Sequence, residues 1–435
     1  MGRIWNPEYE QIERVKLEEL QLQRLQWVVK WASERVPAYK QKFDEAGIKP
    51  KDIRSLADLE KLPFTTKEEL KEDYPYGFFA LPMNKIVRIH STSGTTGTPV
   101  AVGYSRGDLN TWAELVARVA TAAGVTEEDL AQISFGYGLF TGGFGLHYGL
   151  ERIGAAVLPA STGNTERQIM IMRDFGTTAL IGTPTYALHL CEVAKSMGED
   201  IKTLPLRVGL FGSEPWSEGM RREIQDRMGI LATDNYGLTE VMGPGVAGEC
   251  AEQNGLHFAE DHFIPEIVDS DTGKPVSEGE KGELVITTLT KEGFPMIRYR
   301  TRDLTHFMPY DCPCGRTLRR ISRIMGRTDD MLIIKGVNVF PSQIEQVLTE
   351  VEGVEPQYQI ILKKKGVMDD IEVEVEVSEK VFPDAMRKLV EFEREIESRL
   401  QTALGIYVKV KLVEPRSIER SGGKAKRVVD RREEA

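Results

Sequence analysis

The sequence predicts an α/β fold, with a large N-terminal α/β domain built on largely parallel sheets and a small α+β domain at the C-terminus. Two observations support this prediction. Apolar segments of strand length alternate with helical patterns through the middle of the chain, as they do in parallel α/β sheets. Beyond residue 326 the pattern changes to alternating strands around one long charged helix. We therefore place the two domains at residues 1–326 and 327–435.

The composition is that of a globular protein with more than one domain. The chain has 435 residues, of which 41% are hydrophobic and 28% are charged. Its net charge of −11 argues against nucleic acid as a partner. It contains no apolar run of about 18 residues, so we expect no membrane span. The first residues lack the apolar core of a secretory signal, so we expect a soluble, cytoplasmic protein.

The elements of the N-terminal domain follow from periodicity. Residues 10–36 carry apolar side chains near helical spacing and stop at Pro37, and residues 108–123 form a second predicted helix. Later strands at residues 283–288 and 294–300 predict a small barrel-like appendage. The strands predicted before them lie at residues 85–90, 100–104, 131–135, 155–159, 178–182, 207–211 and 230–233.

The C-terminal domain carries clear signals of its own. Ser342 and Glu345 form a predicted capping box that opens a helix. Residues 371–377 alternate valine or isoleucine with glutamate, which is typical of a half-buried antiparallel strand. A charged helix over residues 383–404 and a strand over residues 406–412 complete the predicted domain.

A loop rich in hydroxyl groups and glycine joins the predicted strands at residues 85–90 and 100–104. Such a loop can bring backbone N–H groups and hydroxyl donors close to a phosphate chain. No lysine follows Gly97, which excludes a Walker A loop. The alternative is an ordinary surface turn. The candidate phosphate-binding residues are Ser91, Thr92, Ser93, Gly94, Thr95, Thr96 and Gly97.

Further stretches follow this loop along the chain, and together they carry a resemblance. They are Gly212-Ser213-Glu214-Pro215, Asn235-Tyr236-Gly237-Leu238-Thr239-Glu240, Tyr299-Arg300-Thr301-Arg302-Asp303, Gly326-Arg327-Thr328-Asp329-Asp330 and Ile334-Lys335-Gly336-Val337. The set resembles the adenylate-forming superfamily of acyl-CoA ligases, luciferases and peptide-synthetase adenylation domains. Within it, the opening Trp5-Asn6-Pro7-Glu8 and residues 136–143 and 420–428 are most similar to the phenylacetate–CoA ligase branch.

The resemblance implies an ATP site. A carboxylate would attack the α-phosphate of ATP, so positive charge and hydrogen-bond donors must gather where the two anions meet. Residues 91–97 would hold the β- and γ-phosphates, Glu240 would hold Mg²⁺, and Thr239 would contact the α-phosphate. Asp303 would accept hydrogen bonds from the ribose hydroxyls, with Arg327 nearby. The residues implied around the adenine are Gly212, Ser213, Glu214, Pro215, Asn235, Tyr236 and Gly237.

The resemblance also implies a mobile C-terminal domain. Lys424 would bridge the substrate carboxylate and the α-phosphate, and the domain would then rotate about Asp329 to admit CoA. Lys335 and Gly336 would line the tunnel for the pantetheine arm of CoA. The alternatives are that Lys424 is a solvated lysine in a basic tail, that Lys426 takes its role, and that Gly336 is a simple turn glycine.

The resemblance to the phenylacetate–CoA ligase branch also implies an aryl pocket, formed by aromatic residues among glycines. Phe135, Tyr137 and Phe140, together with Gly212, are the candidates that would line an aryl pocket. The alternative for these aromatic residues is core packing. No cationic residue stands out in this segment, which favours a monocarboxylate with an apolar body.

The cysteines suggest a metal site. Cys312 and Cys314 form a tight knuckle, and Cys250 and His257 could supply two more ligands from another loop. A Cys₃His set is a recognised structural zinc site. The alternatives are free thiols and a histidine bonded to a backbone carbonyl. The remaining cysteine, Cys191, is predicted to be a buried helix residue.

The function these observations favour is an ATP-dependent, AMP-forming aryl-acid–CoA ligase that uses Mg²⁺ and coenzyme A, with phenylacetate or a relative such as indoleacetate as substrate. One alternative is an adenylyltransferase that acts on another acceptor, such as a deazaflavin, without CoA. A second is a nucleotide-binding module without turnover. The resemblance makes a homodimer plausible, and we expect neither a nucleic-acid nor a membrane partner.

Overall fold

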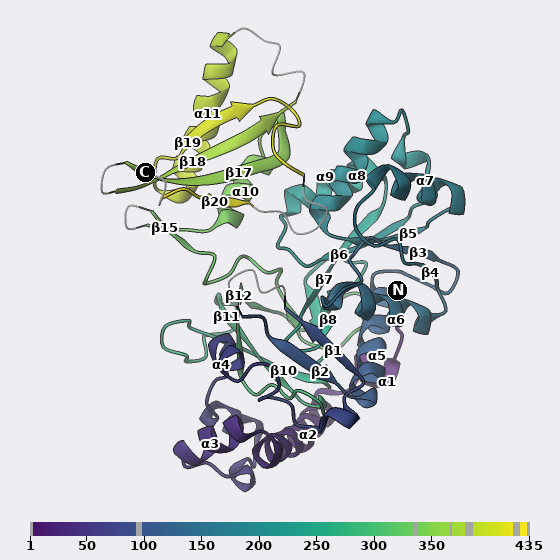
Figure 1. The fold of residues 1–435 in the computed structure, drawn as a ribbon, viewed down its shortest axis with the longest axis vertical. Helices are drawn as coiled ribbons and strands as arrows, with labels where there is room; N and C mark the ends of the chain where they lie inside the picture. The colour runs from purple at the N-terminus through teal and green to yellow at the C-terminus, as the bar shows by residue number, and fades with distance from the viewer. Residues whose placement is uncertain are drawn as a thin grey trace.

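The computed structural model describes residues 3–92, 98–334, 337–365, 368–378, 386–420 and 427–432. Figure 1 shows a large N-terminal part and a separate C-terminal domain, drawn in green to yellow, at one end of it. This separation and the mixed architecture confirm the predicted fold class. In the described ranges, no helix is long and apolar enough to cross a membrane.

A nine-stranded sheet is the framework of the N-terminal domain, with the strand order β13-β14-β9-β8-β7-β6-β5-β3-β4. Five of its strands run parallel, which confirms the prediction from alternating strands and helices. They are β3 (Leu130–Ile133), β4 (Ala156–Leu158), β5 (Ala179–Gly182), β6 (Val208–Gly212) and β7 (Leu231–Leu238). The antiparallel strands are β8 (Gly243–Glu249), β9 (Leu256–Phe258), β13 (Phe307–Met308) and β14 (Arg320–Ile321).

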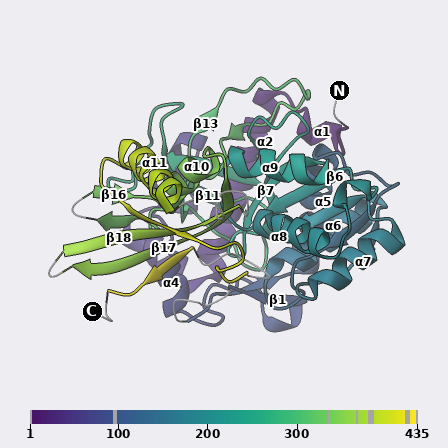
Figure 2. The same ribbon diagram turned by 90° about the horizontal axis from the view of Figure 1, so that it is seen from above.

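Helices connect and cover these strands. Figure 2 shows α5 to α9 gathered around the strands of this sheet. The helix α5 packs on both α6 and β8, so the sheet and its cover share one apolar core. The helices are α5 (Arg106–Ala122), α6 (Thr141–Ile153), α7 (Thr165–Phe175), α8 (Pro184–Ser196) and α9 (Glu218–Met228).

The helix predicted at residues 10–36 is confirmed over residues 14–35, and a separate short helix precedes it. The short α1 (Pro7–Glu10) ends where the Glu10 carboxylate accepts a hydrogen bond from the Asn6 N–H and pairs with Arg316. The helix α2 (Arg14–Arg35) then runs to the predicted boundary. Pro37 opens the next helix, as proline often does at a first helical position. The remaining helices of this part are α3 (Pro37–Glu45) and α4 (Lys67–Glu72).

Two smaller sheets complete the N-terminal domain. The strands β1 (Arg88–Ser91) and β2 (Ala101–Tyr104) form an antiparallel pair, as the loop between them predicts. An antiparallel sheet contains β10 (Phe263–Val268), β11 (Gly282–Thr288) and β12 (Tyr299–Thr305).

The sequence misplaces β12, and the barrel-like closure predicted for this appendage is not confirmed. The strand begins at Tyr299 rather than at residue 294. Phe294, Met296 and Ile297 are buried in the core instead, and Arg298 has a positive φ of 46°, which interrupts an extended chain.

The C-terminal domain has its own apolar core. Its sheet has the order β19-β18-β17-β20. The helices α10 (Pro341–Thr349) and α11 (Met386–Leu404) lie against each other, and each contacts the sheet. The strands of this sheet are β17 (Val354–Lys365), β18 (Met368–Val377), β19 (Lys409–Val413) and β20 (Val428–Asp430). The strands β15 (Leu332–Ile334) and β16 (Val337–Val339) form a separate antiparallel pair.

The predicted capping box of α10 is wrong. The helix begins at Pro341, and the Phe340 N–H donates to Oε1 of Gln343 at 3.0 Å. Ser342 instead donates its hydroxyl to the Met325 carbonyl at 2.5 Å. The Ser342 hydroxyl, which the local pattern assigned to the helix cap, therefore bonds to a residue outside the helix.

Candidate functional site

A cavity of about 730 Å³ lies where the parallel strands β6 and β7 end. Ser213 directly follows β6, and Thr239 and Glu240 directly follow β7. Ligands of α/β sheets bind at such carboxyl ends, because loops from neighbouring strands converge there. The predicted site residues that line this cavity are Thr92, Phe140, Ser213, Gly237, Thr239, Glu240, Arg327 and Asp329.

The base of the candidate phosphate loop is well defined. The Thr92 N–H donates to the Val100 carbonyl at 3.0 Å, and the Val100 N–H donates to the Thr92 hydroxyl at 3.0 Å. Ser91 donates its hydroxyl to the Thr92 carbonyl at 3.0 Å. The base of the loop at Thr92 therefore lies at the rim of the cavity. Its predicted residues Ser93, Gly94, Thr95, Thr96 and Gly97 lie outside the described residues.

Thr239 and Glu240 sit in the tight connection between β7 and β8. A Cβ on Gly237 would lie 1.8 Å from the Gly243 carbonyl oxygen, so this turn requires glycine. The Thr239 hydroxyl lies 3.2 Å from that of Thr141, and the Glu240 carboxylate lies 3.3 Å from Nζ of Lys67. The connection thus presents a hydroxyl and a buried carboxylate to the cavity.

This oxygen set fits Mg²⁺. Magnesium prefers one or two carboxylates and keeps its other positions for water and substrate phosphates. Glu240 supplies the carboxylate, and Thr92 and Thr239 line the same cavity. Burial, and next the Glu240 carboxylate, raise the pKa of the Tyr299 hydroxyl well above its ordinary value, so this hydroxyl stays a neutral neighbour of the carboxylate.

Two lysines near Glu240 were missed by the sequence reasoning. Lys67 pairs with Glu240 directly. Lys291 is fully buried, donates to the Val241 carbonyl at 2.6 Å, and lies 4.6 Å from the ring centre of Tyr104. Burial lowers the pKa of Lys291 to about 7, although Asp108 and Glu240 oppose that shift. The sequence around Lys67 signals only the start of a helix, which says nothing about a partner so distant in the chain.

Asp303, Arg327 and Asp329 form one connected group at the boundary between the domains. The Tyr236 hydroxyl donates to Asp303 at 2.6 Å, and Arg327 pairs with Asp303 at 3.0 Å. Arg327 also donates to both carboxylate oxygens of Asp329, at 2.8 and 3.0 Å. The candidate ribose carboxylate and the candidate hinge residue are therefore tied through a single guanidinium.

The candidate adenine residues separate into two groups. Ser213 lines the cavity with a positive φ of 74°, and Gly212 lies so close to Asn235 that a Cβ would be 2.2 Å from its carbonyl oxygen. Asn235 accepts from the Gly245 N–H at 3.1 Å, and Tyr236 is buried in the core. The second group, Glu214 and Pro215, lines a separate cavity of about 660 Å³ between the domains.

Only one of the candidate aryl-pocket residues lines the cavity. Phe140 does so, and 40% of it is exposed. Phe135 is buried in the core, in line with the alternative reading of these aromatics as packing residues. The Tyr137 hydroxyl lies 3.1 Å from Nδ1 of His147 on α6. The predicted Lys335, Gly336 and Lys424 lie outside the described residues.

A buried acidic pair lies behind the site. The Asp234 N–H donates to Oε2 of Glu249 at 2.8 Å, and Arg221 donates to the other oxygen of Glu249 at 2.8 Å. Burial, and next the charge of Glu249, raise the pKa of Asp234 to about 7. Because the folded state favours protonated Asp234, ionising this group costs stability as the pH rises from about 4 to about 7.

We predict that Asp234→Asn stabilises the protein at pH 8, by on the order of 2 kcal/mol, because asparagine is neutral and avoids that cost. At pH 4, where Asp234 is protonated in the folded state, the change should have much less effect. Urea unfolding of both proteins at the two pH values measures the difference. A stabilisation that is equal at both values would contradict the raised pKa.

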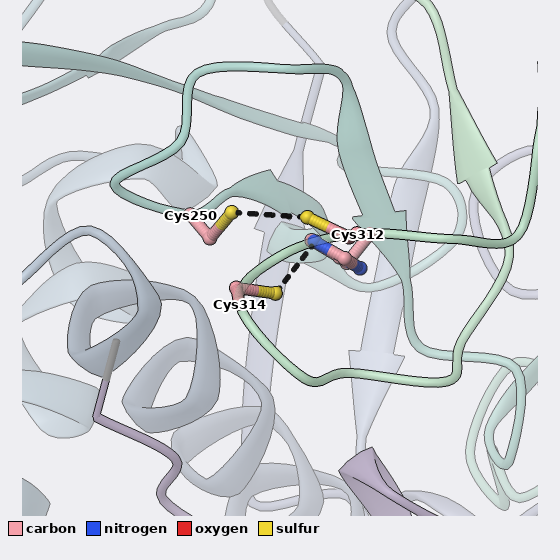
Figure 3. A group of neighbouring side chains, drawn as sticks. Cys250, Cys312 and Cys314 are labelled. Carbon is pink, nitrogen blue, oxygen red and sulfur yellow. Dashed lines mark hydrogen bonds between the residues drawn. The ribbon is translucent and has the colours of Figure 1, made fainter. Parts of the chain in front are cut away.

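Three cysteines and one histidine converge beside α5 and β8. Figure 3 shows Cys250, which follows β8, facing Cys312 and Cys314 from the loop between β13 and β14. The two sulfurs of Cys250 and Cys312 lie 3.8 Å apart, and the Cys314 sulfur lies 3.4 Å from Nε2 of His257. The four candidate ligand atoms all lie within 4.8 Å of one another. The cysteines form no disulfide.

This geometry fits a tetrahedral zinc ion. Zn–S bonds of about 2.3 Å at tetrahedral angles place two sulfurs about 3.8 Å apart, which is the Cys250–Cys312 separation. The ligands come from two chain segments that the site brings together, so an ion held by them would join these segments. Cys191 lies apart from the group, in a buried position on α8, as predicted.

Comparisons with known proteins agree with this geometry. The family described as AMP-binding enzyme matches residues 23–290, and the AMP-binding enzyme C-terminal domain matches residues 336–432. The phenylacetate–coenzyme A ligase of Escherichia coli (strain K12) is 49% identical over 99% of both chains.

Solved structures of one enzyme resemble the whole chain in two states. A crystal structure of 2-hydroxyisobutyryl-CoA ligase in the postadenylation state, in complex with R3-HIB-AMP, is 32% identical and superposes with a TM-score of 0.94, covering 99% of this chain and 93% of that one. The same enzyme in the thioesterification state, with 2-HIB-AMP and CoA, gives a TM-score of 0.74 at the same coverage. The matches confirm the resemblance seen in the sequence: the chain belongs to the family of AMP-binding enzymes, which form adenylates.

Proposed function

We propose that this chain is an ATP-dependent, AMP-forming phenylacetate–CoA ligase, which converts phenylacetate or a closely related aryl acid to its CoA thioester. One observation carries the proposal: Thr92, Thr239 and Glu240 meet in the cavity at the carboxyl ends of β6 and β7. The near full-length identity to the Escherichia coli phenylacetate–CoA ligase supports the choice of reaction and acid. The proposed substrates, ATP and CoA, also favour a cytoplasmic location.

The first half-reaction is adenylation. An oxygen of the acid carboxylate attacks the α-phosphorus of ATP, and the bond to pyrophosphate breaks. Thr92 and Thr239 would donate hydrogen bonds to phosphate oxygens, and Glu240 would hold Mg²⁺, which supplies positive charge to the phosphates when bound. Lys424 would bridge the carboxylate and the α-phosphate.

The ribose would lie near the domain boundary. Asp303 would accept from its hydroxyls, and the guanidinium charge of Arg327 opposes the rise in pKa that burial causes at Asp303. Ser213 would lie at the adenine edge of the same cavity. With these assignments, part of the nucleotide and the acid would share the cavity of about 730 Å³.

The second half-reaction forms the thioester. The CoA sulfur attacks the acyl carbonyl, the bond to AMP breaks, and the thiol proton leaves to water. We propose that the C-terminal domain changes position between the steps, with Asp329 as the hinge and Lys335 and Gly336 beside the pantetheine arm. The different TM-scores to the two states of 2-hydroxyisobutyryl-CoA ligase support such a change.

The acid pocket favours an apolar aryl group. Phe140 offers an exposed ring at the cavity, whereas the Tyr137 hydroxyl contacts His147. An aromatic substrate ring can pack on such side chains without a charged partner. The preference between phenylacetate and a larger relative such as indoleacetate depends on the space that Phe140 leaves.

The test is acid-dependent ATP consumption with and without CoA, over a panel of aryl and short-chain acids. Phenylacetyl-CoA and AMP as products are expected. An adenylate that forms without a thioester would favour an adenylyltransferase acting on another acceptor. Binding of Mg·ATP without turnover of any acid would favour a nucleotide-binding module. Size-exclusion chromatography of the same sample tests the homodimer that the resemblance suggests.

We also propose that Cys250, His257, Cys312 and Cys314 bind one structural zinc ion. The sulfur separations and the Cys₃His composition support zinc over softer or harder ions. The ion would join the chain after β8 to the loop between β13 and β14, and none of its four ligands lines the cavity of about 730 Å³. Its role would therefore be in stability.

We predict that the purified protein carries about one zinc per chain, and that Cys314→Ser loses the metal and lowers the melting temperature by about 5 °C or more. Cys191→Ser is the matched control, because burial raises the pKa of Cys191 to about 12 and keeps this thiol protonated. Elemental analysis and thermal unfolding measure both effects. Metal-free protein in which Cys250, Cys312 and Cys314 titrate freely in the native state would end the zinc proposal.

A further inference from the structure

Arg420 joins the two domains. It donates from Nε and Nη2 to both carboxylate oxygens of Glu192 on α8, each at 3.1 Å. It also donates to both oxygens of Glu376 on β18, at 2.6 and 2.8 Å. The three side chains are only 14%, 15% and 1% exposed. Two bidentate contacts between largely buried side chains hold one guanidinium in place.

The two carboxylates have different relations to Arg420. Glu376 lies in the same domain, and it also accepts from the N–H groups of Arg416 and Ile418, at 3.0 and 2.7 Å. Glu376 therefore holds the turn that precedes Arg420 through contacts within the C-terminal domain, and these contacts do not depend on where that domain lies. Glu192 belongs to the N-terminal domain, so its contact with Arg420 exists only while the two domains are docked as they are here.

Other contacts cross the same interface. Arg227 on α9 pairs with Glu355 on β17 at 3.0 Å, and the Ser217 N–H donates to Glu345 at 3.1 Å. Arg227 also pairs with Glu223 on its own helix at 2.6 Å, so part of its charge is already balanced within the N-terminal domain. Among these contacts the bidentate Arg420–Glu192 pair has the most specific geometry.

This docked arrangement resembles one state of the related enzyme and differs from the other. The chain superposes closely on 2-hydroxyisobutyryl-CoA ligase that holds an acyl-AMP in the postadenylation state, and less well on that enzyme in the thioesterification state. We propose that Arg420 and Glu192 are positioning residues that hold the C-terminal domain in the arrangement that resembles this acyl-AMP-bound state, and not in that of the thioesterification state. The proposal rests on the ligase function proposed above.

The position of Arg420 in the sequence links the Arg420–Glu192 pair to the proposed catalytic lysine. Lys424 follows four residues later, so a contact that fixes Arg420 also limits how far the proposed catalytic lysine can lie from Arg420. Neither Arg420 nor Glu192 lines the cavity of about 730 Å³, so neither touches the reacting groups. Their effect on catalysis would come through domain position.

The test compares Glu192→Gln with the wild-type enzyme in each half-reaction separately. Glutamine keeps the size of the side chain and removes its charge. Phenylacetate-dependent exchange of pyrophosphate into ATP should fall about tenfold in kcat, with little change in the KM for ATP. Thioester formation from supplied phenylacetyl-AMP and CoA should be unchanged or faster.

Glu199→Gln is the control, since Glu199 loses an ion pair, to the more exposed Arg173, that lies within the N-terminal domain. It should leave both half-reactions unchanged. Arg420→Lys, which keeps the charge but not the bidentate geometry, should lie between Glu192→Gln and the wild type. Equal losses in both half-reactions, or no loss in the first, would overturn the proposal.

Small-angle X-ray scattering separates this proposal from the assigned reaction. Glu192→Gln should shift the scattering curve away from the docked arrangement, and Glu199→Gln should not. If the wild-type enzyme shows no exchange with any acid, the ligase function fails, and the scattering result alone decides whether the pair holds the domains. An unchanged scattering curve for Glu192→Gln would then overturn the pair's role.

Discussion

Lys424→Ala is expected to lower acid-dependent adenylation by about 10²–10³-fold, because it removes the positive charge that would bridge the carboxylate and the α-phosphate as they meet. Thioester formation from supplied phenylacetyl-AMP should be nearly unchanged, since the adenylyl transfer is already complete. The two half-reactions are measured separately, by pyrophosphate exchange and by release of AMP in the presence of CoA.

Lys426→Ala is the control, since Lys426 is the rival lysine in the same basic tail. A loss of adenylation in Lys426→Ala and not in Lys424→Ala would exchange the two roles. If both half-reactions survive in Lys424→Ala, its assignment as the bridging residue is wrong. If both are lost, a structural role at the interface is the simpler explanation.

Glu240→Gln is expected to lower adenylation by roughly 10²-fold and to raise the Mg²⁺ concentration needed for half-maximal rate. The amide keeps the shape of the side chain but not the negative charge that a hard cation prefers. It also leaves Lys67 without its carboxylate partner, so the positive charge of that lysine further disfavours the metal. A Mg²⁺ titration of the exchange rate measures the shift.

Glu278→Gln is a suitable control for that titration, because Glu278 is an exposed carboxylate paired with Arg319 and does not line the cavity. Its Mg²⁺ dependence should equal that of the wild type. A Glu240→Gln enzyme that is slow at every Mg²⁺ concentration, with an unchanged half-maximal value, would remove Glu240 from the metal site and leave it a role in holding the β7–β8 connection.

The sequence was most informative where local pattern and global fold agree. Alternation of strands and helices predicted the parallel sheet, and the motifs after β6 and β7 placed Ser213, Thr239 and Glu240 in one cavity because carboxyl ends of parallel strands converge. The Cys₃His set was also found from residue type alone, and the structure brings its four ligand atoms together.

Predictions from the sequence failed where the structure of a residue depends on a partner far away in the chain. Ser342 looked like a helix cap but bonds to Met325, and residues 294–297 looked like a strand but fill the core. The contacts of Lys67 with Glu240 and of Arg420 with Glu192 join residues far apart in the chain, and no periodicity encodes such pairs. Aromatic side chains among glycines were likewise ambiguous, and Phe135 proved to be buried while Phe140 lines the cavity.

The anchoring of Arg420 has a consequence for the search that Lys424 must make. Four peptide bonds separate the two residues in the sequence, and a fully extended chain spans at most about 3.6 Å per residue, so their Cα atoms are never more than about 14 Å apart. One amine confined within that radius has a local concentration on the order of 0.1 M. While Arg420 stays paired with Glu192, the proposed bridging lysine therefore needs no motion of the whole domain to search the volume within reach of Arg420.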